Sequence, residues 1–240
     1  MSTIDGGWRG PNIVKNGLVL YLDASSPNSY YGGRGTVWKD VSGNGNNGTL
    51  TNGPTFNSGN GGSIVFDGID DRVSRNGSIN TGQNFTLNAW IYPTLLGTTR
   101  RAVASSSYNY TSQNGWLFCT AGANVNNTFF LSAGSDQAYR VAAANTLSLN
   151  QWVYISAICQ NGGGSINLYK NGIETPYART LLSTNALTYT YPQFSVGFRD
   201  SAGTSDPYTG NISVVQIYNR ALSATEVLQN FNATRARFGI

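Results

Sequence analysis

The stretch of residues 208–231 constrains the fold of this chain most, because it has the pattern of a strand that leads into a short helix. Ile212, Val214 and Ile217 are strand-type apolar positions, and Val215 interrupts their strict alternation. Upstream of this stretch, short strand-like segments alternate with turns. The pattern predicts a β-domain that ends in one small helix.

The helix in this stretch carries its own start signal. Ser223 stands three residues before Glu226, the spacing of a capping box, in which the two side chains bond to free backbone amides of the first turn. Val227, Leu228 and Phe231 follow at helical spacing, so one face of the helix can pack on a sheet.

Strand signals recur along the rest of the chain. Residues 85–92 alternate between an apolar and a more polar face, and residues 18–24, 151–159 and 165–170 are further short strand-like segments. Asn171-Gly172 predicts a type I′ hairpin turn, because both residues accept a positive φ. About a dozen such strands predict an all-β fold: an antiparallel β-sandwich, or jelly roll, with one short C-terminal helix.

The composition indicates a weakly charged, ordered protein. Charged residues make up 11% of the chain, against about 25% in typical globular proteins, whereas 12% of the residues are aromatic. The net charge is +4, and its densest basic spots, Arg100-Arg101 and Arg235 with Arg237, make no continuous basic face. We therefore expect no nucleic-acid partner.

The sequence shows no membrane or export signal. No run of about eighteen apolar residues predicts a membrane span, and the first fifteen residues lack the apolar core of a signal peptide. The expectation is therefore a chain made in a cytoplasm, with no membrane partner.

The predicted domain organisation is an N-terminal arm at residues 1–16 and one sandwich domain at residues 17–240. The arm is rich in Gly and Pro and contains a lone Trp8, with Arg9 and Pro11 close by. Two interpretations are open: the arm docks on a neighbouring protein through these residues, or it straps over the domain's own sheet.

The two cysteines, Cys119 and Cys159, both lie in strand-like runs. We expect them to be small buried hydrophobic residues, since a disulfide would require neighbouring strands. With no histidine in the chain they offer no zinc site.

Five motifs in order carry a family resemblance: VFDGIDD at 65–71, FTLNAWI at 85–91, QWV at 151–153, INLYKNG at 166–172 and GNI to YNRALS at 210–223. This order resembles the laminin-G-like, concanavalin A-like lectin/glucanase superfamily over roughly residues 17–232. The opening and the ending of the chain look in particular like versions of this domain in virion proteins of tailed bacteriophages.

The resemblance includes glucanases, but the residues argue against an enzyme. Retaining glycosidases need two carboxyl groups about 5–5.5 Å apart, which this fold supplies from alternating positions of one strand. The chain has two glutamates, Glu174 just after a turn and Glu226 in the cap, and no strand with carboxylates two residues apart. A serine or cysteine hydrolase would need a histidine base, and none is present. We expect no catalytic residues.

Calcium is the one cofactor that the resemblance suggests, and otherwise none is expected. The candidates by type are Asp23, Asp40, Asp67, Asp70 and Asp71. The family's acidic pair in the closing strand is replaced here by Ser213 and Val214, which removes two hard ligands. The alternative is that the carboxylates around residues 67–70 bond to backbone amides of a turn.

Aromatic residues in polar loops are the candidate ligand contacts, since sugar sites place aromatic faces against pyranose rings. The segment 105–113 with Tyr108 and Tyr110, followed by Trp116, is the predicted site, and Tyr139 lies in similar surroundings. A protein interface and plain packing remain open for the same residues.

Two function classes follow from the resemblance. The first is a non-enzymatic structural virion protein, such as a capsid decoration or fibre component, that contacts other virion proteins and is localised to the particle, there as a homo-oligomer. The second is a carbohydrate-binding adhesin that recognises a cell-surface glycan. A weakly charged chain without histidine, with a Trp-bearing arm, favours the first.

Overall fold

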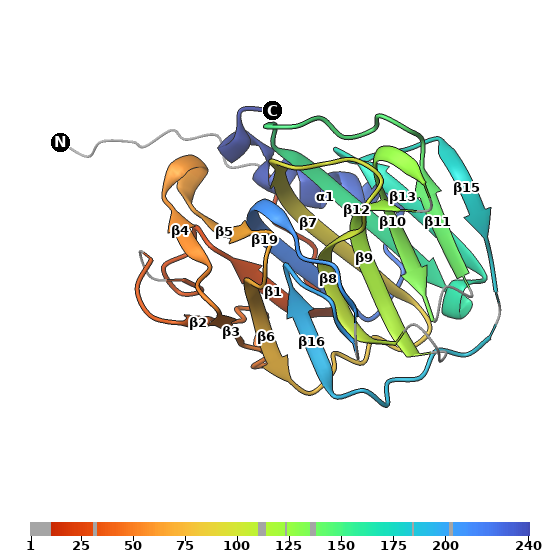
Figure 1. The fold of residues 1–240 in the computed structure, drawn as a ribbon, viewed down its shortest axis with the longest axis horizontal. Helices are drawn as coiled ribbons and strands as arrows, with labels where there is room; N and C mark the ends of the chain where they lie inside the picture. Colours follow the sequence, from red (N-terminus) through yellow and green to blue (C-terminus); the bar gives the residue numbers. More distant parts are fainter. Residues whose placement is uncertain are drawn as a thin grey trace.

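The computed structural model describes residues 11–30, 33–109, 114–122, 124–134, 138–183, 185–201 and 204–240. Within these residues, strands form an eight-stranded sheet A and a nine-stranded sheet B that pack face to face (Figure 1). Every named strand pair is antiparallel, which confirms the predicted β-sandwich. No helix in the described part of the chain is long and apolar enough to cross a membrane.

Sheet A brings together strands from both ends of the chain. In spatial order its strands are β14 (Ile173–Glu174), β13 (Ser165–Lys170), β12 (Val153–Gln160), β7 (Phe85–Pro93), β19 (Thr209–Tyr218), β5 (Ser63–Asp67) and β4 (Thr55–Asn57), with β1 (Leu18–Asp23) also paired to β19.

Sheet B contains the central part of the chain. In spatial order its strands are β15 (Tyr177–Leu181), β11 (Ala138–Ala142), β10 (Val125–Ala133), β9 (Asn114–Gly122), β8 (Arg101–Asn109), β16 (Gln193–Val196), β6 (Arg72–Asn76), β3 (Gly48–Thr51) and β2 (Val37–Trp38). A separate hairpin pairs β17 (Asp200–Ser201) with β18 (Thr204–Ser205). The helical elements are α1 (Ala224–Thr234) and three 3₁₀ turns, η1 (Gly59–Gly61), η2 (Asn161–Gly163) and η3 (Arg235–Phe238).

The apolar alternation predicted for β7 determines which of its side chains face the core between the sheets. Phe85, Leu87, Ala89 and Ile91 belong to the core between the sheets, whereas Trp90 faces outward from sheet A. Both faces of β7 are nevertheless buried, because α1 and η3 cover the outer face. The outer face of sheet A around β7 is therefore covered by these helical elements.

The interruption of the β19 pattern at Val215 is a β-bulge. Pairing with β7 shifts register between Ile212 and Val214, so that Ser213 is the extra residue. Ile212 and Val215 both reach the central core, whereas Val214 faces the aromatic cluster under η3. The bulge thus explains why strict alternation fails in the sequence.

The capping box at the start of α1 is confirmed. The Glu226 backbone N–H donates to Ser223 Oγ at 3.3 Å, and the Ser223 N–H donates to Glu226 Oε2 at 2.9 Å. The same carboxylate is held bidentately by Arg220, with N···O distances of 2.5 and 3.0 Å. The Arg220 guanidinium, followed by the Ser223 amide, lowers the pKa of Glu226 to about 2.

We predict that Glu226→Gln lowers the free energy of unfolding by about 1 kcal/mol at pH 7, because the ion pair is partly exposed. Since the folded-state pKa lies below the ordinary 4.5, this contribution is complete above about pH 4.5 and is lost as the pH falls toward 2. Urea unfolding of both proteins at pH 7, 4 and 2 measures the difference. A difference of the same size at pH 2 would contradict the assignment to the carboxylate.

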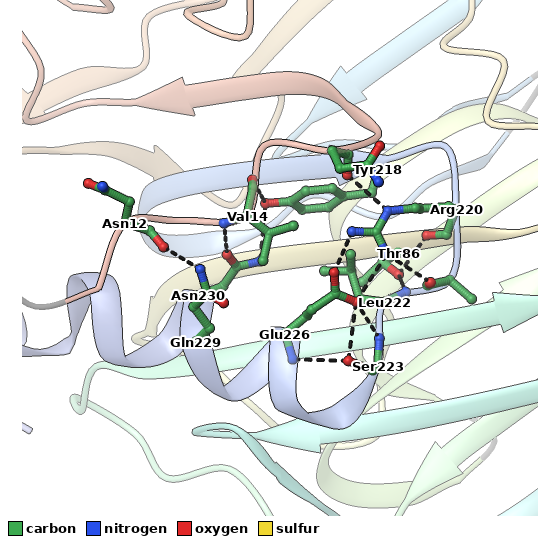
Figure 2. A network of polar contacts seen from close by, with 12 residues as sticks. Asn12, Val14, Thr86, Tyr218, Arg220, Leu222, Ser223, Glu226, Gln229 and Asn230 are labelled. Carbon is green, nitrogen blue, oxygen red and sulfur yellow. Dashed lines mark hydrogen bonds and ion pairs between the residues drawn. The ribbon is translucent and has the colours of Figure 1, made fainter.

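Residues 12–16 lie on the domain's own surface, as Figure 2 shows for Asn12 and Val14. Val14 is buried, and its N–H donates to Asn230 Oδ1 at 2.8 Å while its carbonyl accepts from Tyr218 Oη at 2.9 Å. Arg220 Nε donates to the Asn16 carbonyl at 3.0 Å. These contacts favour the strap interpretation for this segment, called the strap below. Pro11 is exposed, and Trp8 and Arg9 lie outside the described residues, so docking through them stays a prediction.

Two local predictions are also confirmed. Asn171 and Gly172 have φ of 51° and 80° and join β13 to β14, as a type I′ turn requires. Cys119 and Cys159 are buried free thiols in different sheets. Burial raises the pKa of Cys159 to about 12, so this thiol behaves as a small apolar side chain.

Candidate ligand-binding site

The outer face of sheet B brings together two of the predicted ligand residues. Tyr108 on β8 and Tyr139 on β11 belong to one apolar cluster on this face, with Leu117, Phe130 and others between them. Tyr108 is 3% exposed, whereas Tyr139 is only half-buried at the rim. Of these two rings, Tyr139 is the one that a ligand could reach.

Trp116 lies on the opposite face of the same sheet. It is completely buried in the core, with ring centroids 6.1 Å from Phe85 and 6.3 Å from Phe194. Successive residues of a strand point to opposite faces, so Leu117 and Trp116 cannot share one. The burial favours packing among the roles left open for Trp116. Tyr110 lies outside the described residues.

A segment that sequence reasoning did not single out lies over part of this outer face. The Asp206 carbonyl accepts from the Ala102 N–H at 2.8 Å, and Arg199 lies over the Tyr108 ring at 5.6 Å. Arg199 is 1% exposed and forms an ion pair with Asp206 at 2.6 Å. Tyr108 is therefore a packing residue whose ring is covered by Arg199. In the sequence, the only sign of this arrangement is an Arg and an Asp that lie near each other.

A cleft of about 360 Å³ opens where the free edges of the two sheets meet, at the side where β2, β3 and β4 lie in Figure 1. We call it the edge cleft; its lining residues are Tyr30, Gly33, Gly35, Thr36, Leu50, Gly53, Pro54, Thr55 and Phe56. Tyr30 and Phe56 form a tilted ring pair 5.6 Å apart and pack on the central core. An apolar, aromatic lining with a few hydroxyls and backbone groups is typical of small-ligand sites.

Two glycines, Gly33 and Gly35, line this cleft, and the lack of a side chain at Gly33 lets the backbone approach the Phe56 ring. Gly33 has a φ of +75°, and a Cβ there would come within 2.9 Å of Phe56. Gly35 has a φ of +80°, and a Cβ there would meet no atom within 4 Å, so this position faces open space. The backbone at Gly35 is also held in place, because the Tyr30 hydroxyl donates to the Gly35 carbonyl at 3.0 Å.

A second cleft of about 210 Å³ adjoins the edge cleft. We call it the basic cleft; its lining residues are Pro27, Ser29, Arg34, Gly35, Thr36, Val37 and Lys39. Gly35 and Thr36 line both clefts. A third cleft, of about 380 Å³ beside β14, includes Lys170 and Glu174, which already bond to Thr146 and to Asn167. That cleft offers few free polar groups.

Three candidate calcium ligands lie together in the turn between β5 and β6. The carboxylates of Asp67, Asp70 and Asp71 come within 4.8 Å of one another. The turn interpretation is also confirmed, because Asp67 Oδ1 accepts from the Ile69 N–H at 2.8 Å and Asp71 Oδ2 from the Asp67 N–H at 2.9 Å. Burial raises the pKa of Asp71, and the neighbouring Asp67 and Asp70 charges add to the rise.

The other candidate calcium ligands are occupied elsewhere. Asp23 accepts from Arg237 at 2.9 Å, and Asp40 accepts from the Tyr21 N–H at 2.9 Å. In the closing strand, Ser213 Oγ is bonded by Arg237 and supplies no carboxylate. The oxygen donors at residues 67–71 suit Ca²⁺ by type, and calcium binding there stays a prediction.

Sequence comparison defines the family of this chain. The family model described as the concanavalin A-like lectin/glucanases superfamily matches residues 66–228, more than half of the chain. The chain belongs to this superfamily, and the resemblance noted in the sequence is confirmed. Comparison with curated proteins found no match.

Solved structures with the same fold include several proteins in complex with sugars. Domain 4 of AbnA, an extracellular arabinanase from Geobacillus stearothermophilus in complex with arabinotriose, has a TM-score of 0.66 and 17% identity, over 90% of this chain and 98% of that one. The botulinum neurotoxin serotype D ligand-binding domain in complex with N-acetylneuraminic acid has a TM-score of 0.63 and 14% identity, over 91% and 51%. Trypanosoma rangeli sialidase in complex with sialic acid has a TM-score of 0.59 and 14% identity, over 92% and 33%.

At these identities the likenesses show the fold alone. The chain spans nearly all of the arabinanase domain, but about half of the neurotoxin domain and a third of the sialidase. The residues that line the edge cleft, from Tyr30 to Phe56, all precede the matched residues 66–228.

Proposed function

We propose that this chain is a non-catalytic, lectin-like domain that binds a glycan in the edge cleft. The observation that carries the proposal is the lining of the cleft: the half-buried Phe56 ring, which packs against the buried Tyr30 ring, together with the exposed Thr36 and Thr55. Aromatic faces take the apolar side of a sugar ring, and hydroxyls and backbone groups take its polar substituents.

The fold supports this function over the structural virion role. The arabinanase domain and the neurotoxin domain are both sugar complexes on this sandwich, which fits an adhesin that recognises a cell-surface glycan. A place on a phage particle stays a prediction, and the two roles are compatible, because a virion-borne lectin would have both. Mass spectrometry of purified particles would test that location.

The expectation of no catalysis rests on the occupied glutamates. Glu174 accepts from Asn167 at 2.7 Å, and Glu226 is held by Arg220 and the helix cap. Neither lies in the edge cleft. Incubation of the protein with the glycans that it binds should release no product, and turnover abolished by changing one aspartate would overturn this part of the proposal.

We predict that Phe56→Ala weakens glycan binding about tenfold or more, since a stacked ring contributes about 0.5–1.5 kcal/mol beyond its buried area. Titration calorimetry with arabino-oligosaccharides and sialylated oligosaccharides would measure the affinity. Gly35→Asn is a second variant, because Asn tolerates a positive φ and its side chain would enter the open cleft without removing core packing. It should block binding while leaving the melting temperature nearly unchanged.

Tyr139→Ala is the matched control for this experiment. It removes the half-exposed ring on the outer face of sheet B, and we expect it to leave the affinity unchanged. Loss of binding with Tyr139→Ala but not with Phe56→Ala would move the site to sheet B. No binding of any glycan at millimolar concentration would overturn the proposed function.

A further inference from the structure

The basic cleft places two cations beside the edge cleft. Arg34 and Lys39 line it, and the two clefts share Gly35 and Thr36 in their linings. A sugar ring that packs on Phe56 would therefore have its substituents on the Gly35 side directed toward a basic surface.

Neither cation is neutralised by a described residue. Arg34 and Lys39 have no ion pair or side-chain hydrogen bond within the part of the chain that the structure describes, unlike Arg199, Arg220 and Arg237, which pair with acids. Asp40, next to Lys39 in sequence, directs its carboxylate to the amides of Tyr21 and Asn46. The two positive charges are thus available to a ligand.

The edge cleft also has an acidic neighbour. Gly53 lines the cleft, and a Cβ there would lie 3.6 Å from Asp71 Oδ1, a member of the three-aspartate cluster. The lining is therefore close to negative charge at Gly53, whereas Gly35 is shared with the basic cleft. An anionic group would be repelled near Gly53 and attracted near Gly35, which favours one orientation of an acidic ligand.

We propose that the preferred ligand carries a carboxylate-bearing sugar, whose ring packs on Phe56 and whose carboxylate is bound by Arg34 and Lys39. This inference rests on the proposed glycan binding in the edge cleft. The Arg34 guanidinium can bind the carboxylate through two parallel N–H donors, and Lys39 adds a compact second charge. A neutral sugar would contact the Phe56 ring but leave both cations unused.

The test compares sialyllactose with lactose, and a glucuronate-containing disaccharide with its neutral counterpart, by titration calorimetry of the full chain. We expect each acidic sugar to bind about tenfold more tightly than its neutral match, with a preference that falls as salt rises. Arg34→Gln should weaken binding of the acidic sugars about tenfold and leave the neutral ones within twofold. Lys39→Gln should have the same selectivity with a smaller effect.

Arg179→Gln is the matched control. Arg179 is exposed on β15, at the side of the sandwich opposite β2 and β3 in Figure 1, and the variant makes the same change in net charge. It should leave every affinity unchanged. Equal binding of acidic and neutral sugars, lost with Phe56→Ala, would overturn the inference and leave the proposed function standing. Absence of all sugar binding would overturn both.

Discussion

Trp90→Ala is expected to lower the free energy of unfolding by about 3–5 kcal/mol, the largest effect of any substitution proposed for this chain. Trp90 is completely buried between the outer face of sheet A and the C-terminal helices. Its ring stacks on Phe238 at a centroid distance of 4.0 Å and on Phe231 at 5.8 Å. Its Nε1–H donates to Thr234 Oγ1 at 2.7 Å.

The expected loss of unfolding free energy is large because the Trp90 indole contacts several elements. One side chain contacts α1, η3 and the neighbouring strand β12 through Tyr154, so its removal leaves a cavity that three elements border. The Thr234 hydroxyl also loses the bond from the indole, although it still donates to the Asn230 carbonyl at 3.1 Å. Because neither helix can move inward without breaking its own contacts, the cavity should persist and add to the lost burial.

Guanidinium unfolding of Trp90→Ala and of Trp152→Ala tests whether the loss of stability depends on the position of Trp90 or only on the removal of one aromatic side chain. Trp152 is half-buried at the rim of the same cluster, 4.8 Å from Phe238 and 5.4 Å from Tyr92. Its removal should cost about 1–2 kcal/mol, in proportion to its smaller burial. Equal effects would contradict the central place of Trp90. Both variants should retain glycan affinity in native buffer, since neither residue lines the edge cleft.

The outer face of sheet A is covered, whereas the side of the sandwich with the edge cleft is accessible. Helix α1, η3 and the strap cover that face, and Arg199 and Asp206 contact β8 of sheet B. The side where β2, β3 and β4 end stays open, with its rings reaching the central core. A ligand bound there would contact a rigid base, which limits the conformational cost of binding.

The fold was predictable because each signal is local. The alternation of β7, the Asn171-Gly172 turn and the Ser223–Glu226 cap each depend on residues within one element or one turn. Such signals determine their own structure whatever surrounds them. The bulge at Ser213 shows the limit, because the extra residue is defined only by its pairing with β7.

The candidate site was predictable only in part. Tyr108 and Trp116 stand close in the sequence, yet they face opposite sides of sheet B, and the pairing of β8 with β9 shifts register between Ser106 and Asn109. The edge cleft combines Tyr30, Leu50 and Phe56, which have no common motif. Their proximity results from the meeting of two sheet edges, and no spacing in the sequence encodes it.

Asn230→Ala is expected to lower the free energy of unfolding by about 2–4 kcal/mol and to release the strap. Asn230 is completely buried; its Oδ1 accepts from the Val14 N–H, and its Nδ2 donates to Tyr218 Oη at 3.1 Å. Because Tyr218 Oη donates in turn to the Val14 carbonyl, the three residues form a closed ring of bonds (Figure 2). Alanine would leave a buried amide and a buried hydroxyl short of partners, at about 1–3 kcal/mol each.

Gln229→Ala is the control for this prediction, because the adjacent side chain also bonds to the strap, at the Asn12 carbonyl, but from an exposed position. Water can replace that bond, so its loss should cost less than about 1 kcal/mol. Hydrogen exchange at the Val14 amide should accelerate strongly in Asn230→Ala and little in Gln229→Ala. Similar exchange in both variants would mean that apolar packing of Ile13 and Val14, and not the buried amide, holds the strap on the domain.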